Sequence, residues 1–287
     1  MLAVFARELK SQIVTMTGWT YAAFVLAFIG IYTMMYNFNY GYGNFEYALS
    51  GMTFVYLMAV PVLTMRCFAE ERHQKTDQLL YSLPLSSFKI MLGKYLAMLV
   101  LLAMPLVVSC LYPLILAQFG EVYLPTAYAS IFAFFLLGAA LTAIGMFASS
   151  LCESQVTAAV ACFIMLIIDY FLPSLSTYIP SGTVTAVITL TVFVVVCAIG
   201  LTLLTKNGVF GVGVGIIAEI AIIVGAVISP ESFEGLIADF LSGLSLFDRF
   251  SPFVNGMFDL TSVTFFVAVC VVFAFLTVNS FDKRRWS

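Results

Sequence analysis

Charged residues are scarce in this sequence of 287 amino acids. Only 9% of the residues are charged, whereas 62% are hydrophobic, and the mean hydropathy is +1.08. A soluble domain of this length carries about a quarter charged residues. The scarcity of charge therefore excludes an ordinary soluble fold.

Histidine and nucleotide-binding motifs are also lacking. His73 is the only histidine, which excludes a metal site built on histidines and argues against a histidine-dependent catalytic triad. The glycines between Gly208 and Gly215 are not followed by Gly-Lys-Ser/Thr, so they do not form a phosphate-binding loop. Close packing of membrane helices explains them better. We therefore expect no catalytic residues, no bound cofactor and no metal in this chain.

Long apolar runs are abundant. A helix that crosses about 30 Å of hydrocarbon needs roughly 20 apolar residues, and the alternation typical of membrane β-barrels does not occur. We expect an all-α polytopic membrane protein with about eight transmembrane helices, forming a single transmembrane domain over residues 1–287. The runs are Trp19–Asn37, Met52–Thr64, Met91–Phe119, Tyr128–Leu151, Val156–Leu172, Thr183–Leu204, Val209–Ile228 and Thr261–Phe281. Pro105 and Pro113 predict a kink or an early end in the third run.

The distribution of lysine and arginine predicts the orientation. If the N-terminus is cytoplasmic and eight spans alternate, all of the 12 basic residues except Arg249 fall in cytoplasmic segments. In membrane proteins the cytoplasmic loops carry more lysine and arginine than the external loops do. We expect a multi-pass protein of the bacterial inner (cytoplasmic) membrane with both termini in the cytoplasm.

Three segments differ from the plain spans. Residues 1–14 place apolar and basic side chains on opposite faces, which predicts an amphipathic helix in the inner interface. Residues 229–259 carry apolar side chains at helical spacing and predict a helix on the outer interface. Residues 66–90 form a polar cytoplasmic segment between the second and third runs.

The polar segment 66–90 has the pattern of an amphipathic helix. Its apolar stripe consists of Thr76, Leu79, Leu80 and Leu83. Its charged face consists of Glu70, Glu71, Arg72, Lys75 and Asp77. Pro84 ends the predicted helix because proline cannot continue it. A charged amphipathic helix beneath the membrane is shaped to fit a groove on a cytoplasmic partner.

The block Leu63–Lys94, with LTMR, AEER, TDQLL, LPLS and LGK in order, resembles type-two ABC exporter permeases of the gliding-motility-like branch. The tail Asp259–Trp286 and the N-terminal helix, an elbow helix in that family, are similar as well. Family members commonly have six spans, so residues 183–228 look like an extra helix pair. Asp77–Gln78 also departs mildly from the family pattern.

The resemblance implies that Phe68–Pro84 is a coupling helix seated in a separate cytoplasmic ABC ATPase. ATP and Mg²⁺ would then be bound by that partner. The coupling residues would be Glu70, Glu71, Arg72, Thr76, Leu79, Leu80, Leu83 and Pro84. It further implies a second permease copy or a paralogue as a partner. The remaining contact expected is with the lipid bilayer, and we expect no nucleic acid to bind.

Two functions are compared on this basis. The first is the permease subunit of an ATP-driven exporter, which moves an unidentified substrate outward. The alternative is a proton- or ion-coupled secondary transporter that uses the intramembrane carboxylates Asp169 and Glu219. That alternative predicts internal inverted repeats, which the sequence does not show convincingly, and it leaves the charged segment 66–90 unexplained. The sequence contains no motif that supports a third function, that of a membrane-embedded enzyme.

Overall fold

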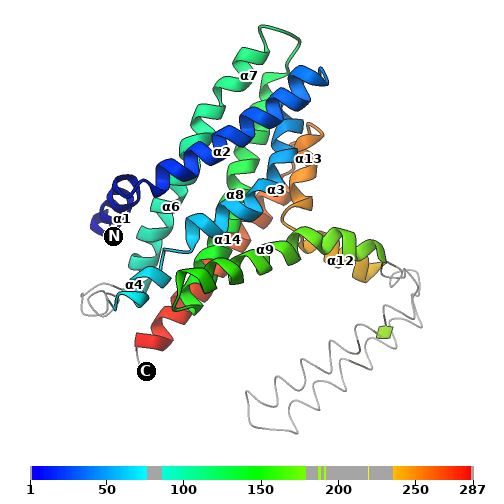
Figure 1. The fold of residues 1–287 in the computed structure, drawn as a ribbon. Coiled ribbons are helices and arrows are strands. Elements are labelled where there is room, and N and C mark those ends of the chain that lie inside the picture. The colour runs from blue at the N-terminus through cyan, green and yellow to red at the C-terminus, as the bar shows by residue number, and fades with distance from the viewer. Residues whose placement is uncertain are drawn as a thin grey trace. The chain divides into compact units, whose positions relative to one another are not determined.

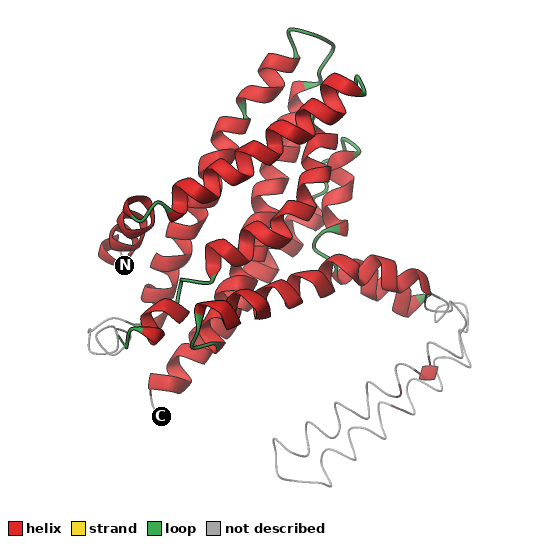
Figure 2. Ribbon diagram, viewed as in Figure 1, coloured by secondary structure: helices red, strands yellow, loops and turns green. Residues whose placement is uncertain are grey.

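A computed structural model describes residues 2–75, 86–178, 187–188, 191, 219 and 235–285. Throughout those residues every regular element is a helix (Figures 1 and 2), which confirms the predicted all-α class. The elements are α1 (Leu2–Val14), α2 (Thr17–Thr33), the π-helix η1 (Met34–Asn39), α3 (Glu46–Thr64), α4 (Ala69–His73), α6 (Ser87–Ser109), α7 (Leu111–Leu116), α8 (Leu124–Leu151), α9 (Gln155–Tyr178), α12 (Leu236–Leu244), the 3₁₀-helix η3 (Asp248–Phe250), α13 (Ser251–Val254) and α14 (Leu260–Arg285).

Six helical stretches within the described residues are long and apolar enough to cross a membrane. They are Gly18–Asn39, Glu46–His73, Ser87–Leu116, Leu124–Leu151, Gln155–Tyr178 and Leu260–Lys283. These six correspond to six of the predicted runs. The other two, Thr183–Leu204 and Val209–Ile228, lie almost wholly outside the described residues, so the extra helix pair at 183–228 stays a prediction.

The chain divides into two compact units, Met1–Asp169 with Arg249–Ser287, and Tyr170–Asp248. Within the first unit, α8 is the central helix and packs against α3, α6 and α14. Its glycines permit this close approach, because small residues let membrane helices come together. Gly145 faces the buried side chain of Thr64, and Gly138 faces Tyr56. The Tyr56 ring stacks on Phe134 of α8 at 4.3 Å between centroids.

The third span is interrupted as its prolines predict. Helix α6 ends at Ser109 and α7 begins at Leu111, with Cys110 between them. Pro113 has no N–H to donate to the carbonyl of Ser109, so the regular hydrogen-bond ladder cannot continue through this point. The span therefore changes from one helix to another near its end, while Pro105 is accommodated inside α6.

Helix α1 covers the predicted N-terminal amphipathic segment. It packs against α6 and α2, and the chain then turns sharply into α2 through Met16. Met16 adopts φ 60°, the left-handed conformation, which costs a non-glycine residue roughly 1–2 kcal/mol. The turn fixes α1 at an angle to the first spanning helix, as an elbow (Figure 1).

In the second unit, the described part of the predicted external segment contains α12. Phe240 and Leu244 of this helix are exposed, and Phe247 packs edge-on against Tyr170 at 5.1 Å. A helix is therefore present where the sequence predicted one. Its position on the outer interface stays a prediction.

The packing of α8 generates a first test, the substitution Gly145→Ala. A Cβ atom at Gly145 would approach the Thr64 side chain to within 2.8 Å of Cγ2 and 2.9 Å of Cβ, closer than atoms tolerate. We expect a loss of about 1–3 kcal/mol in the free energy of unfolding, measured as a lower thermal unfolding midpoint in detergent. Gly120→Ala is the matched control, because nothing lies within 4 Å of its added Cβ. Equal midpoints for the two variants would contradict this account of α8.

Candidate functional site: the anchor of α4

A buried lysine lies where α1, α4 and α6 meet. The side chain of Lys94, on α6, is only 1% exposed. Its Nζ atom lies 3.0 Å from a carboxylate oxygen of Glu8 on α1 and 3.0 Å from one of Glu71 on α4. It also donates a hydrogen bond of 2.9 Å to the backbone carbonyl of Cys67. An ammonium group has three donors, and each of them has an acceptor here.

Arg7 completes a charge cluster, which consists of Arg7, Glu8, Glu71 and Lys94. Its Nη2 atom lies 2.9 Å from both Glu8 and Glu71. The two acids and two bases balance, so the cluster is formally neutral. Lys94 and both glutamates are largely enclosed, whereas the Arg7 side chain is 56% exposed.

The electrostatics of α1 reflect this arrangement. Burial alone would raise the pKa of Glu8, but the Lys94 ammonium and the hydrogen bond from Arg7 outweigh it and hold the pKa below its ordinary value. The hydrogen bond from Arg7 to Glu8 raises the pKa of Arg7. Both shifts favour the charged forms of Glu8 and Arg7 at neutral pH.

Helix α4 is also attached to α8. The Ser149 hydroxyl on α8 accepts hydrogen bonds from the backbone N–H groups of Phe68 (3.1 Å) and Ala69 (3.2 Å), at the start of α4. Near the end of α4, the Arg72 guanidinium donates to the carbonyl of Cys152 at 3.0 Å. A tertiary contact thus satisfies N–H groups that a helix start leaves without partners.

These contacts explain why such a short helix forms. Glu70 and Glu71 lie in its first turn and Arg72 and His73 in its last, which suits the helix dipole. The helix ends at His73, and Lys75 then takes φ 55°. A left-handed residue does not continue an α-helix. The continuous helix expected over Phe68–Pro84 is therefore interrupted after its first turns.

The structure describes three of the predicted coupling residues, Glu70, Glu71 and Arg72. Glu71 belongs to the charge cluster, and Arg72 is buried against the end of α8. Glu70 is half-buried and accepts a hydrogen bond of 3.4 Å from Gln74. Thr76, Leu79, Leu80, Leu83 and Pro84 lie outside the described residues. Contact of any of these residues with an ATPase stays a prediction.

The two acids that the sequence predicts within the membrane, Asp169 and Glu219, are distant in sequence from the charge cluster. Asp169 is half-buried on α9. Glu219 accepts a hydrogen bond of 2.7 Å from the Thr191 hydroxyl. A hydrogen bond between a carboxyl group and a hydroxyl group fits a purely structural role as well as a role in transport. The coupling role of either acid therefore stays a prediction.

Sequence analysis missed the central residue of the site. Lys94 counted there only as one of the basic residues that fix orientation, and Arg7 and Glu8 only as the polar face of an interfacial helix. The missed signal is that Lys94 lies inside the apolar run Met91–Phe119, of which it is the one charged residue. A lysine in that position needs an acidic partner, and Glu8 and Glu71 are acids predicted at the same membrane face.

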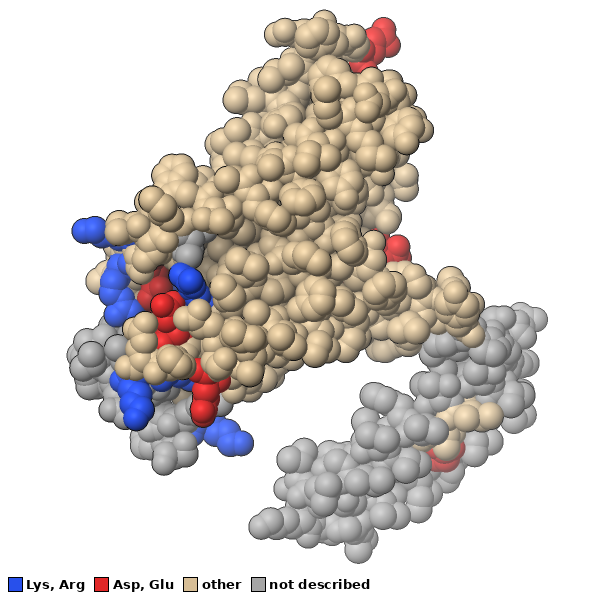
Figure 3. All heavy atoms as spheres, in the orientation of Figure 1, with Lys and Arg blue, Asp and Glu red and all other residues tan. Residues whose placement is uncertain are grey.

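Charged side chains gather at one end of the first unit. Figure 3 shows lysines and arginines, with acids between them, around α1, α4 and the C-terminal part of α14, whereas the rest of the visible surface has few charges. At the same end the Ser87 hydroxyl, at the start of α6, donates to the Asp282 carboxylate near the end of α14. Exposed apolar residues line the spans between the two ends, such as Val160 and Ile164 on α9.

Six helical stretches that are long and apolar enough to cross a membrane, among the described residues, are those of a multi-pass membrane protein. The comparison of sequences agrees, because residues 6–286 match the family described as ABC-2 family transporter protein. The chain belongs to this family. It is thus the membrane permease subunit of an ABC transporter, not itself a catalytic enzyme, and membership implies partnership with an ABC ATPase subunit. Neither the curated proteins nor the solved structures gave a match.

The charge cluster generates a second test, the substitution Lys94→Met. It leaves the enclosed carboxylates of Glu8 and Glu71 with Arg7 alone, and breaking a buried ion pair costs roughly 3–5 kcal/mol. We expect a large drop in the thermal unfolding midpoint. Lys89→Met, an exposed lysine on the same helix, is the matched control. The triple variant Glu8→Gln, Glu71→Gln, Lys94→Met should recover part of the loss, because the only charge it leaves is that of Arg7, whose side chain is 56% exposed to water. A single variant as stable as the control would contradict the cluster.

The lowered pKa of Glu8 generates a third test, in the pH dependence of stability. A carboxyl group whose folded-state pKa lies below its ordinary value of 4.5 stabilises the fold above that pH and loses this effect as the pH falls through the folded-state pKa. We expect the stability difference between the wild type and Glu8→Gln to be greatest at neutral pH and to shrink in acid below pH 4.5. Thermal unfolding across this range measures it, and a constant difference would show that Glu8 is not held as an ion.

Proposed function

We propose that this chain is the permease of an ATP-driven exporter of a bacterial inner membrane, and that the segment from α4 to the start of α6 docks on a cytoplasmic ABC ATPase. One observation carries the proposal. Helix α4 is fastened to α1 and α6 by the charge cluster and to α8 by Ser149 and Arg72. A displacement of α4 therefore acts on three helices at once.

The cluster suits the transmission of force because its members cannot separate cheaply. Pulling α4 away from α6 would leave Lys94 without Glu71 in a site that water hardly reaches, and an uncompensated buried charge costs several kcal/mol. Movement of α4 as a rigid attachment to α6 avoids this cost. ATP-driven closure of the ATPase pair would thus tilt the base of α6 and α1, and reorient the spans toward outward release of substrate.

The orientation in the proposal places the charged end of the first unit in the cytoplasm. Lysines and arginines gather around α1, α4 and the end of α14 (Figure 3), and cytoplasmic segments are enriched in these residues. His73, Gln74 and Lys75 are exposed at this end. They lead directly into residues 76–85, whose apolar side chains Leu79, Leu80 and Leu83 would enter a groove of the ATPase. A second permease copy or a paralogue would complete the transporter.

Docking and force transmission can be tested by different substitutions. The docking variant is Leu79→Asp with Leu83→Asp, which removes the apolar contact with the groove. The anchor variant is Lys94→Met, which leaves the outward side chains intact. Each is purified through an affinity tag in mild detergent from cells that contain the native ATPase, and ATP hydrolysis by the purified complex is measured.

The two variants should fail in different ways. We expect the docking variant to lose most of the co-purified ATPase, about tenfold or more, because a few central residues carry most of the binding energy of an interface, at about 2 kcal/mol or more each. We expect the anchor variant, assayed below its lowered unfolding midpoint, to retain the ATPase but to hydrolyse ATP at a rate different from that of the wild-type complex. Glu121→Arg, at the opposite end of the first unit, is the control. Wild-type protein that brings down no ATPase would refute the proposal.

A further inference from the structure

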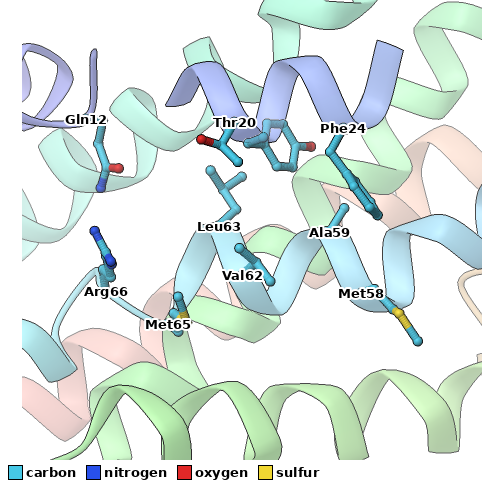
Figure 4. Close-up of a pocket in the computed structure, with 10 residues that line it drawn as sticks. Gln12, Thr20, Phe24, Met58, Ala59, Val62, Leu63, Met65 and Arg66 are labelled. Atoms are coloured by element: carbon cyan, nitrogen blue, oxygen red, sulfur yellow. The ribbon is translucent and has the colours of Figure 1, made fainter. Parts of the chain in front are cut away.

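A cavity lies beside the charge cluster, between α1, α2 and α3. Its volume is about 410 Å³, within the range of ligand pockets. Figure 4 shows the lining side chains, most of them apolar, such as Phe24 of α2 and Met58 and Val62 of α3. These three are exposed on the outer surface of spanning helices. The cavity therefore opens sideways, toward the region that a bilayer occupies.

One end of this cavity is polar. Gln12 of α1 and Arg66, which follows α3, extend toward one another there (Figure 4). Both residues also line a second cavity of about 400 Å³, which is polar and borders the charge cluster. The apolar and the polar cavity thus share Gln12 and Arg66. Together the two cavities form an amphipathic space at the charged end of the first unit.

Arg66 brings a positive charge to a polar cavity that Glu8, Glu70 and Glu71 also line. The carboxylates of Glu8 and Glu71 are taken up by Arg7 and Lys94. In the portion of the chain that the structure describes, Arg66 forms no ion pair, and its buried Nε atom has no hydrogen-bond acceptor. A buried donor without an acceptor destabilises the fold, and more so when it is charged.

A second buried donor near this cavity also lacks an acceptor among the described residues. Tyr21 of α2 lines the apolar cavity and is only 4% exposed, and its buried hydroxyl likewise has no partner among the described residues. The space thus combines a guanidinium whose buried Nε atom has no acceptor, a buried hydroxyl without a partner among the described residues, and apolar walls open to the bilayer. Its complement is a molecule with an anionic, acceptor-rich head and a hydrocarbon chain.

We propose that this site binds an anionic phospholipid from the adjoining leaflet. The phosphate accepts hydrogen bonds from Arg66, with Gln12 beside it, and an acyl chain fills the apolar cavity between α2 and α3. Phosphate and ester oxygens supply acceptors of the kind that the Tyr21 hydroxyl lacks. The inference is independent of the proposed export function, because it rests on this cavity alone and holds whether or not an ATPase binds.

Native mass spectrometry of the full-length protein in detergent tests the headgroup. The probes are dioleoyl phosphatidylglycerol, which is anionic, and dioleoyl phosphatidylcholine, which is zwitterionic. We expect the wild type to retain phosphatidylglycerol more strongly. Arg66→Gln should lower its retention about tenfold, to the level of phosphatidylcholine, because a charge-assisted hydrogen bond is lost. Lys10→Gln removes an exposed cation of α1 and should change nothing. Equal retention of both lipids by the wild type, or no effect of Arg66→Gln, would overturn the proposal.

A second pair of variants tests the chain-binding part. Val62→Trp fills the cavity from its exposed side and should lower the retention of both lipids. Val107→Trp makes the same change at an exposed position of α6 outside the cavity and should have no effect. Oxidative cross-linking of Val62→Cys in lipid-rich membranes tests the other occupant, a second copy of the chain. Covalent dimers through this cysteine would assign the cavity to protein and overturn the proposal, whereas monomers support a lipid.

Discussion

The enclosed ammonium of Lys94 is the constraint on which the charged end of the molecule depends. A charge held away from water is tolerated only with partners of opposite sign and satisfied hydrogen bonds. Its partners come from three places, Glu8 on α1, Glu71 on α4 and the carbonyl of Cys67. Each of these elements is therefore fixed relative to α6. No single hydrophobic contact could impose so specific an arrangement, because apolar packing lacks direction.

The rigid anchor and the amphipathic space are neighbours and share structural elements. Gln12 and Arg66 border the apolar cavity, and the same residues border the polar cavity that reaches Glu8 and Lys94. Arg66 also lies just before the residues that fasten α4 to α8. A ligand seated against Arg66 would consequently contact both α1 and the connection into α4. The proposed lipid site and the proposed docking segment would therefore be linked through Arg66.

The general fold could be predicted from the sequence because spans depend mainly on the length of apolar runs. Six of those runs appear in the described residues, and the break near Pro113 follows from a missing N–H. The coupling segment was recognised by its residue pattern, but its division at Lys75 was not, because a left-handed turn leaves no mark in hydrophobic periodicity. Lys94 was missed for another reason. Its partners Glu8 and Glu71 are distant in the sequence, and only tertiary structure brings such charges together.

The sharing of Lys94 between two acids has a consequence for the order of assembly during synthesis. Helix α1 precedes α6 in the chain and is therefore synthesised first. Until α6 follows, Arg7 is the one basic partner of Glu8 from this cluster. The amphipathic character of α1 lets it lie at the membrane surface without entering the hydrocarbon. Insertion of α6 then brings a lysine that two carboxylates are already placed to receive. Both acids that pair with Lys94 thus precede α6 in the chain, so the partners of this buried charge are synthesised before the span that carries it.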